Sequence, residues 1–398
     1  MGKTDNRNVV ISRLWRQATW VATCGYGVVL GAMGLLACEE GVRDTTVGSA
    51  SVLVPPVLPG YELDANERKT LAYLKGSIKA RRALPHVKGE VSSTRGRVVL
   101  HAAARETDTD VVVAMLRALP RYYSPSSPEA LQPGGSYEQV VLLRLSGASA
   151  RVQQAALIAA EPLLQRQNPS STVANRAAEL ATSGEGELRI PALQLLLKGS
   201  DSGFRSLLHT ALLDALVGES AAVQALAARE LRRRASALSS EHRERLRSNL
   251  STARSSGSPL LQGLLLDLEL AASGATEDWL GRAVEWLKHP SPYVRARAAE
   301  NLGQIRHTES ASRLIPLLDD DARAAISVRW KTPEGSQSLE YAGSRWPTVS
   351  HAALVALERM SSGSLPRSKV KESADLVLAV RRAKAWHAKQ QATLKRGG

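Results

Sequence analysis

The chain contains very little cysteine and few aromatic residues. Only Cys24 and Cys38, together with a single phenylalanine, occur among 398 residues, and aromatic residues make up 4% of the total. Because no cysteine follows Cys38, the remainder of the chain cannot form an internal disulfide bond. Small and unbranched side chains must therefore fill most of the core, and the many Ala and Leu residues are typical of closely packed helices.

Common catalytic and metal-binding motifs are also missing from the sequence. Eight histidines occur, namely His86, His101, His209, His242, His289, His307, His351 and His387. They form neither an HExxH motif nor another pair spaced i, i+4, which is the helical arrangement of many zinc ligands. There is no phosphate-binding loop, GxGxxG or GxSxG. These absences predict a protein that is not an enzyme and has no cofactor or metal site.

Positive charge is in clear excess, with a formal net charge of +14. The charged residues before Cys38 are Lys3, Asp5, Arg7, Arg13 and Arg16. Their balance is +3, which leaves +11 for the rest of the chain. A basic protein of this size attracts nucleic acid, anionic lipid or an acidic protein. Charge alone does not choose among these partners, and an arginine-rich genome composition is a further explanation.

The N-terminal 40 residues are arranged like a bacterial export signal. A basic segment, residues 1–16, precedes an uncharged segment, residues 17–37, and two glutamates follow Cys38. This order predicts that the N-terminus stays inside the cell and that the chain after Cys38 is exported. The sequence Leu-Leu-Ala-Cys ending at Cys38 resembles the lipobox of bacterial lipoproteins. The resemblance implies that residues 1–37 are a signal peptide and that the thiol of Cys38 carries a lipid.

Two alternatives to the lipoprotein interpretation remain open. The 21 uncharged residues 17–37 are long enough to cross a bilayer as an uncleaved signal anchor, and the chain could also be soluble in the cytosol. Under the lipoprotein interpretation, residues 38–63 form a flexible tether, because they are rich in Gly, Ser, Thr and Pro. The folded domain, residues 64–398, is then expected in the periplasm or outside the cell, held to a membrane of the cell envelope by the lipid.

A repeated pattern begins near residue 90. A cap-like residue, two spacers, an apolar residue and then small residues recur along the chain, with Ser149, Ser220 and Ser291 expected at helix N-caps. The apolar anchors of this pattern are Val152, Leu188, Val223, Leu260, Val294 and Val349. Their successive separations are 36, 35, 37, 34 and 55 residues. A period of about 36 residues indicates two antiparallel helices per unit.

The repeat resembles HEAT repeats, most closely over residues 289–318. There Val294, Ala298 and Leu302 match the pattern of the second helix of a unit. The resemblance covers about residues 90–365 and implies an all-α fold, an α-solenoid of six to seven antiparallel helix pairs. Helices near residues 64–82 and 368–393 are expected to cap the two ends of the stack.

The longest interruption of the repeat, residues 319–347, predicts a short β-hairpin. Two strand-like segments flank the turn-forming residues 332–335. The insertion carries the residues that we predict to bind a partner protein, Arg329, Trp330, Lys331, Tyr341, Arg345 and Trp346. In the alternative interpretation, Trp330 and Trp346 pack back onto the solenoid.

A basic cluster supports an alternative function. Its arginines are Arg229, Arg232, Arg233, Arg243 and Arg247. The cluster resembles the basic face of HEAT-like DNA glycosylases, which implies a cytosolic nucleic-acid-binding protein. Glu230, Glu241 and Glu244 dilute the charge, and an exported protein meets no genome, so nucleic acid is the less favoured partner. A HEAT-like lyase or glycosylase would need a pocket with convergent polar groups.

The sequence therefore favours a non-catalytic HEAT-repeat scaffold or adaptor that binds another protein at the bacterial cell envelope.

Overall fold

The computed structural model describes residues 62–79, 93–123, 135–147, 149–166, 168–183, 186–199, 203–218, 220–254, 258–332, 335–342, 347–368, 370 and 373–397. The chain divides into two units, Met1–Leu53 and Val54–Gly398, and every described residue belongs to the second unit. The predicted signal peptide, the lipidation residue Cys38 and nearly all of the predicted tether lie outside the described residues.

Helices make up most of this second unit. In chain order they are α1 (Ala65–Lys79), α2 (Ser93–Arg105), α3 (Thr109–Tyr122), α4 (Ser136–Leu145), α5 (Ala150–Ala159), α6 (Glu161–Gln165), α7 (Ser171–Thr182), α8 (Gly186–Lys198), α9 (Arg205–Leu216), α10 (Ala221–Arg234), α11 (Ser240–Arg254), α12 (Pro259–Ser273), α13 (Glu277–Glu285), α14 (Pro292–Gln304), α15 (Ala311–Leu314), α16 (Val349–Met360) and α17 (Ser373–Gly397). Short 3-10 helices are η1 (Ala235–Ala237), η2 (Trp286–Lys288), η3 (Thr308–Ser310) and η4 (Pro316–Asp319).

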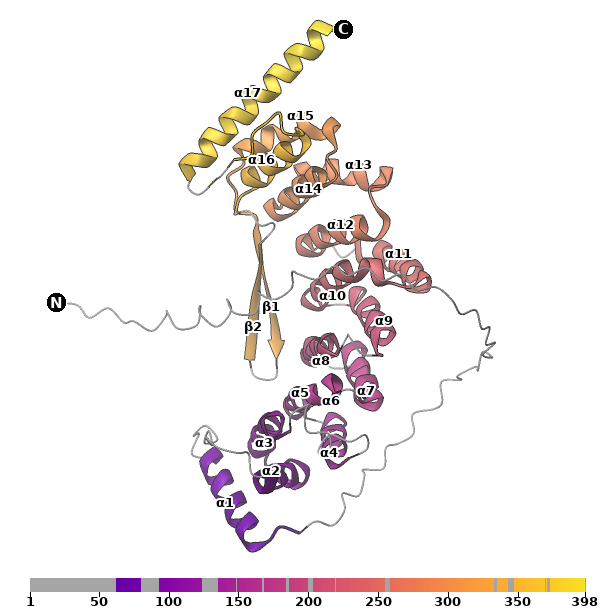
Figure 1. Ribbon diagram of the computed structural model, residues 1–398, viewed down its shortest axis with the longest axis vertical. Helices are drawn as coiled ribbons and strands as arrows, with labels where there is room; N and C mark the ends of the chain where they lie inside the picture. Colours follow the sequence, from indigo (N-terminus) through magenta and orange to yellow (C-terminus); the bar gives the residue numbers. More distant parts are fainter. Residues whose placement is uncertain are drawn as a thin grey trace, which may run out of the picture. The chain divides into compact units, whose positions relative to one another are not determined.

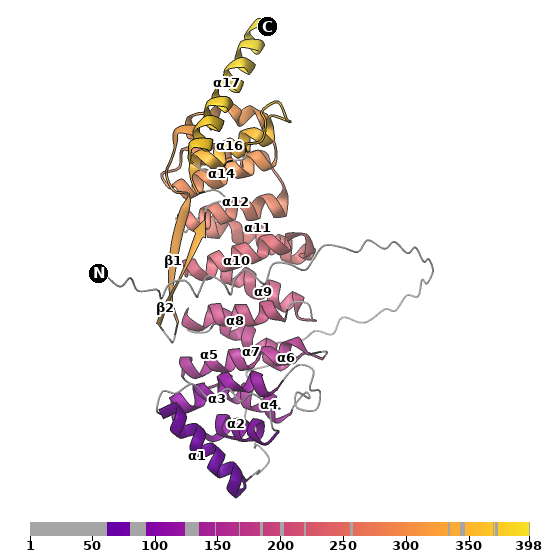
Figure 2. The same cartoon turned by 60° about the vertical axis from the view of Figure 1, so that its left-hand side comes forward.

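The helices stack as consecutive pairs in two layers (Figures 1 and 2). We call the first helices of the pairs the A helices, namely α2, α4, α7, α9, α11, α13 and α15, and the second helices the B helices, namely α3, α5, α8, α10, α12, α14 and α16. Each A helix packs on the B helix of its own pair, and each B helix packs on the next B helix. Among the described residues this gives seven pairs, and it confirms the predicted all-α solenoid.

The apolar anchors of the repeat occupy equivalent places in the stack. Each one lies in the first turn of a B helix, α5, α8, α10, α12, α14 or α16, and each is buried. Ser149, Ser220 and Ser291 hold the predicted N-cap positions with extended backbone, but their side chains accept no capping hydrogen bond. These serines thus begin their helices through backbone conformation, whereas Ser170 and Thr276 cap A helices through their side chains.

Helix α1 packs on α2 and α3 at one end of the stack, and α17 packs on α16 at the other. Asp64 accepts hydrogen bonds from the backbone N–H groups of Asn66 and Glu67, and Glu67 accepts one from the N–H of Asp64. This reciprocal capping box fixes the start of α1. At the other end, Ala383 on α17 is fully buried against the C-terminal part of the core, with Trp386 packed beside it. Each terminal pair therefore has a cover for its apolar face.

Small residues allow neighbouring B helices to approach closely. A Cβ atom added to Gly303 on α14 would lie 2.5 Å from the Cα atom and 2.7 Å from the Cβ atom of Ala356 on α16. Gly263 on α12 is similar, because an added Cβ would overlap the ring of Tyr293 on α14. At Gly303 the backbones of α14 and α16 thus come into direct contact, with Ala356 as the small residue on the other helix.

The predicted β-hairpin is present between α15 and α16. Strands β1 (Ala325–Thr332) and β2 (Gly335–Ala342) pair antiparallel, with Trp330 opposite Gln337 and Thr332 opposite Gly335. The Thr332 hydroxyl donates a 2.9 Å hydrogen bond to the Gly335 carbonyl and closes the turn. Gly335 has φ of 130°, a conformation that only glycine adopts without strain.

Candidate functional site

The hairpin lies along the B helices instead of projecting from them. Strand β1 contacts α14, α10 and α8, and Figures 1 and 2 both show the ribbon alongside these helices. Side chains of β1 alternate between its two faces. Ile326, Val328 and Trp330 are half-buried against the core, whereas Arg329 and Lys331 are exposed. The hairpin thus crosses several pairs with one apolar face inward and one basic face outward.

The structure separates the residues that the sequence predicts to bind a partner. Arg329 and Lys331 share the exposed face of β1, and Trp330 between them packs inward. Tyr341 is on β2, opposite Ile326 in the register. Arg345 and Trp346 lie outside the described residues. Only Arg329 and Lys331 can therefore be assigned to a common exposed surface.

A pocket of about 600 Å³ lies beneath the tip of the hairpin. We call it the hairpin-tip pocket. Helices α5, α6 and α8 form its walls, with the ends of both strands. Its lining residues are Gln154, Leu157, Ile158, Glu161, Ile190, Pro191, Gln194, Leu195, Leu197, Lys198, Trp330, Thr332 and Gln337. Most of this lining is apolar, with an ion pair between Lys198 and Glu161 at its rim.

Two residues that line this pocket each have a buried side-chain polar atom without a hydrogen-bond partner among the described residues. One such atom is the indole Nε1–H of Trp330, which can only donate, and the other is the amide Oε1 of Gln154, which can only accept. Gln154 is 7% exposed. Because leaving such groups unpaired costs about 1–3 kcal/mol each, the pocket is suited to a ligand that brings one acceptor and one donor.

Sequence reasoning missed Gln154. It lies 176 positions before Trp330, and within its own repeat it occupies a buried position of α5 where the pattern has a small or apolar residue. In the sequence, Gln154 is marked only by standing where Ala225 and Ala296 stand in other units. The partner element, the tip of the hairpin, could not be inferred from it.

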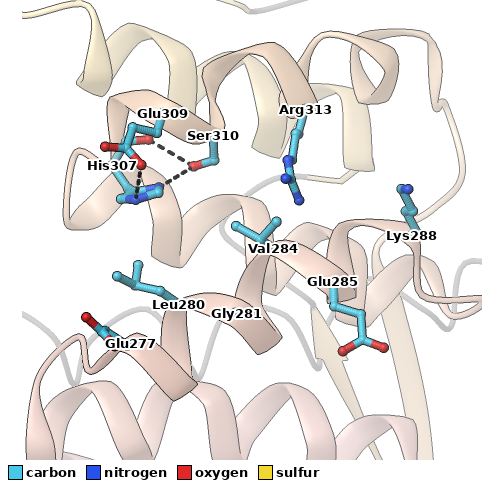
Figure 3. A pocket seen from close by; sticks show the side chains of 10 residues that line it. All are labelled: Glu277, Leu280, Gly281, Val284, Glu285, Lys288, His307, Glu309, Ser310 and Arg313. Atoms are coloured by element: carbon cyan, nitrogen blue, oxygen red, sulfur yellow. Dashed lines mark hydrogen bonds and ion pairs between the residues drawn. The ribbon is translucent and has the colours of Figure 1, made fainter.

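A second groove lies between α13 and α15 on the A-helix layer (Figure 3). Its volume is about 550 Å³, and Leu280 and Val284 supply the apolar part of its lining. His307 Nδ1 is 2.9 Å from the Ser310 hydroxyl, and Figure 3 shows charged side chains of both signs around the opening. None of its described lining side chains has a buried polar atom without a partner. This groove therefore carries a weaker chemical signature than the hairpin-tip pocket.

The arginines of the basic cluster divide between two layers and are largely paired. Arg229 and Arg233 on α10 both donate to the buried carboxylate of Glu230, each over 3.1 Å. Arg232 on the same helix is 3.4 Å from Asp267 on α12. On α11, Arg247 pairs with Glu244 and Arg243 donates to the Ser236 carbonyl. The charge that these arginines present to a phosphate backbone is accordingly smaller than the sequence suggests.

Asp267 is the centre of a buried polar cluster that joins three B helices. It is 2% exposed and accepts a 2.6 Å hydrogen bond from Asn301 Nδ2 on α14. The guanidinium group of Arg297 contacts the same carboxylate from α14, and Arg232 approaches it from α10. Burial lowers the pKa of Arg297, and the nearby Glu300 carboxylate partly offsets this effect. Arg232 is therefore part of a structural ion-pair network.

Within the described ranges, no group of three or more His, Cys, Asp or Glu side chains could hold a metal ion. None of the described helices has both the length and the apolar character needed to cross a membrane.

Comparison with protein families finds a match over part of the chain. A family model of HEAT repeats matches residues 250–330. The matched range contains α12, α13, α14 and α15 and includes the segment in which the sequence pattern is strongest. No curated protein sequence matches the chain. Together, the family match and the stacked helix pairs support a HEAT-repeat protein with the fold of an all-α solenoid.

Proposed function

We propose that the protein is a non-catalytic HEAT-repeat scaffold that binds an extended segment of a partner protein in the hairpin-tip pocket. We further propose that a lipid on Cys38 anchors it to a membrane of the bacterial cell envelope, with the solenoid facing the periplasm or the exterior. HEAT-repeat solenoids present long continuous surfaces for binding other proteins, and the family match supports this general role.

The observation that carries the proposal is the pair of unpartnered atoms, Trp330 Nε1 and Gln154 Oε1. Every non-proline residue of an extended segment offers one backbone C=O and one backbone N–H. A carbonyl of the partner accepts from Trp330 Nε1–H, and an N–H of the partner donates to Gln154 Oε1. A partner peptide thus satisfies both groups without the need for a particular side chain.

The surroundings of these two atoms define the preferred sequence of the partner. Leu157, Ile190 and Leu195 form an apolar wall of the pocket, and Ile158 leaves an apolar surface that is 42% exposed. An aliphatic or aromatic side chain of the partner is expected against this wall. The exposed charges of Arg329 and Lys331, on the outer face of the hairpin, favour acidic residues where the partner passes over the hairpin.

Peptide selection on the full-length chain tests this function. Peptides enriched from a random library are expected to contain an apolar residue next to acidic residues. Trp330→Phe keeps an aromatic ring but removes the donor, and Gln154→Leu keeps the size but removes the acceptor. Because each substitution leaves a peptide group unpaired, each is expected to raise the Kd about tenfold or more, as measured by fluorescence anisotropy.

Tyr73→Phe is the matched control for the peptide measurement. Tyr73 is 62% exposed on α1 and does not line the pocket, so the Kd should stay within twofold of the unmodified protein. Circular dichroism establishes that all three variants keep their helical content. If neither Trp330→Phe nor Gln154→Leu weakens any enriched peptide, or if Tyr73→Phe weakens it equally, the pocket is not the binding site.

The lipid anchor is tested by the mass of the N-terminal peptide from membrane-fractionated bacterial cells that express the chain. The expected peptide begins at Cys38 and carries added acyl mass. Cys38→Ser should abolish this product, whereas Cys24→Ser should leave it unchanged, since the two cysteines differ only in their place relative to the lipobox. A peptide that begins at Met1 in the membrane fraction would replace the lipid by a signal anchor. The same peptide in the soluble fraction would remove the membrane from the proposal altogether.

A further inference from the structure

A third pocket, of about 410 Å³, lies where the start of α9 meets the end of α10. We call it the α9–α10 pocket. Arg205, Leu208 and His209 on α9 line one side, and the opposite side is lined by Glu230, Arg233, Arg234 and Ala237. Its volume lies within the range of small-molecule sites. None of its lining residues belongs to the hairpin-tip pocket.

Positive charge exceeds negative charge in this pocket. Glu230 is 4% exposed and is the one carboxylate among the lining residues. It already accepts from Arg229, Arg233 and Arg234, the last over 2.6 Å. Arg205 pairs with no carboxylate among the described residues. A single buried carboxylate therefore faces several guanidinium groups, and a surplus of positive charge remains for a ligand.

The start of α9 contributes to the same field. Arg205 is its first residue, and the N-cap residue Phe204 provides no side-chain hydrogen bond. The first N–H groups of a helix have no acceptor within the helix, and the helix dipole favours negative charge near them. Helix α9 has 12 residues, and its N-terminal end carries a partial positive charge. This helix end and the arginines therefore both attract an anion.

His209 adds a buried hydrogen-bonding group that has no partner. Its side chain is 2% exposed, and its Nε2 atom bonds to no described residue. Burial, with smaller contributions from His242, Arg234 and Arg205, lowers the pKa of His209. The adjacent His242 differs, because its two ring nitrogens lie 2.7 Å from the Ser239 hydroxyl and 3.3 Å from the Thr210 hydroxyl. The unpaired nitrogen of a neutral imidazole can donate to an anionic oxygen.

From this combination we infer that the α9–α10 pocket binds a phosphate group. Guanidinium groups of Arg205, Arg233 and Arg234 contact the phosphate oxygens, and His209 Nε2 donates a further hydrogen bond. Phosphate suits the pocket because its several oxygens can accept from guanidinium forks simultaneously. The group is either free inorganic phosphate or the phosphate of a small phosphomonoester.

Calorimetric titration of the full-length chain tests this inference, with inorganic phosphate and phosphoserine as the two probes. Arg205→Gln and Arg233→Gln should each raise the Kd for the bound probe about tenfold or more, because each removes a charge-assisted hydrogen bond. Both side chains are exposed, so the variants are expected to fold. Arg247→Gln makes the same change of charge on α11, outside the pocket, and should leave the Kd within twofold.

The two probes distinguish the sources of the phosphate group. Equal affinity for both indicates a site for the ion itself, and tighter binding of phosphoserine indicates a phosphomonoester site; both results support the inference. The inference fails if neither probe binds. It also fails if Arg205→Gln and Arg233→Gln bind as the unmodified protein does, or if Arg247→Gln weakens binding to the same extent.

Discussion

Asp267→Ala is expected to lower the free energy of unfolding by about 3–5 kcal/mol. The substitution removes the carboxylate that Arg297 and Arg232 contact, and it leaves Asn301 Nδ2 with the Arg297 carbonyl as its one remaining acceptor among the described residues. The side chain of Arg297 is 12% exposed, so water cannot replace the lost partner. Arg297 would then keep Glu300, 3.0 Å away, as its remaining carboxylate partner, in a position with little access to water.

Urea denaturation followed by circular dichroism measures this loss. Asp278→Ala is the matched control, because Asp278 is also paired with an arginine, Arg282, but is 76% exposed. An exposed pair contributes about 0–1 kcal/mol, so the free energy of unfolding of the control should be close to that of the unmodified protein. Equal effects of Asp267→Ala and Asp278→Ala would show that the buried cluster makes no special contribution to stability.

Trp279→Ala should destabilise the C-terminal pairs by a similar amount, about 3–5 kcal/mol. Trp279 is 1% exposed and is the largest of the fully buried side chains among the described residues. It extends from α13 onto α12, where its indole N–H donates a 2.9 Å hydrogen bond to the Leu266 carbonyl. Truncation leaves a cavity between these helices and removes the bond.

Trp279→Phe separates the two contributions. Phenylalanine retains much of the apolar contact but not the donor, so its cost should be smaller than that of alanine and reflect mainly the lost hydrogen bond, about 1–3 kcal/mol. Hydrogen exchange of the backbone amides of α13 and α14 should accelerate in both variants. A Trp279→Ala protein with unchanged urea midpoint and exchange would mean that this tryptophan does not hold α13 in place.

Local sequence patterns were sufficient to predict the helix pairs. Val223 and Val294 repeat the same relation to a preceding serine and to following alanines, and both proved to lie in the first turn of a B helix. The hairpin could be predicted in the same way, since its strand-forming residues and the turn at Gly335 are close in sequence. Such features depend on short-range geometry, which a single sequence records directly.

Long-range packing could not be predicted in the same way. The partners of Arg232 and Arg254 are Asp267 on α12 and Glu269 on the same helix, and no spacing rule connects these pairs across separate helices. The position of Trp330 beside α8 is a further example, because more than 130 residues separate Trp330 from Lys198, the last residue of α8. The hairpin-tip pocket results from such contacts.

The hairpin also changes how the stack can unfold. In a solenoid whose units touch only their neighbours, unfolding can begin at an end and travel one unit at a time. Strand β1 contacts α14, α10 and α8, and its tip forms a pocket with α5, so it acts as a cross-brace over the intervening units. Fraying of any of these units requires the brace to detach, which couples them into one cooperative block. Under mechanical load this block should resist extension until the hairpin detaches and then yield in a single step.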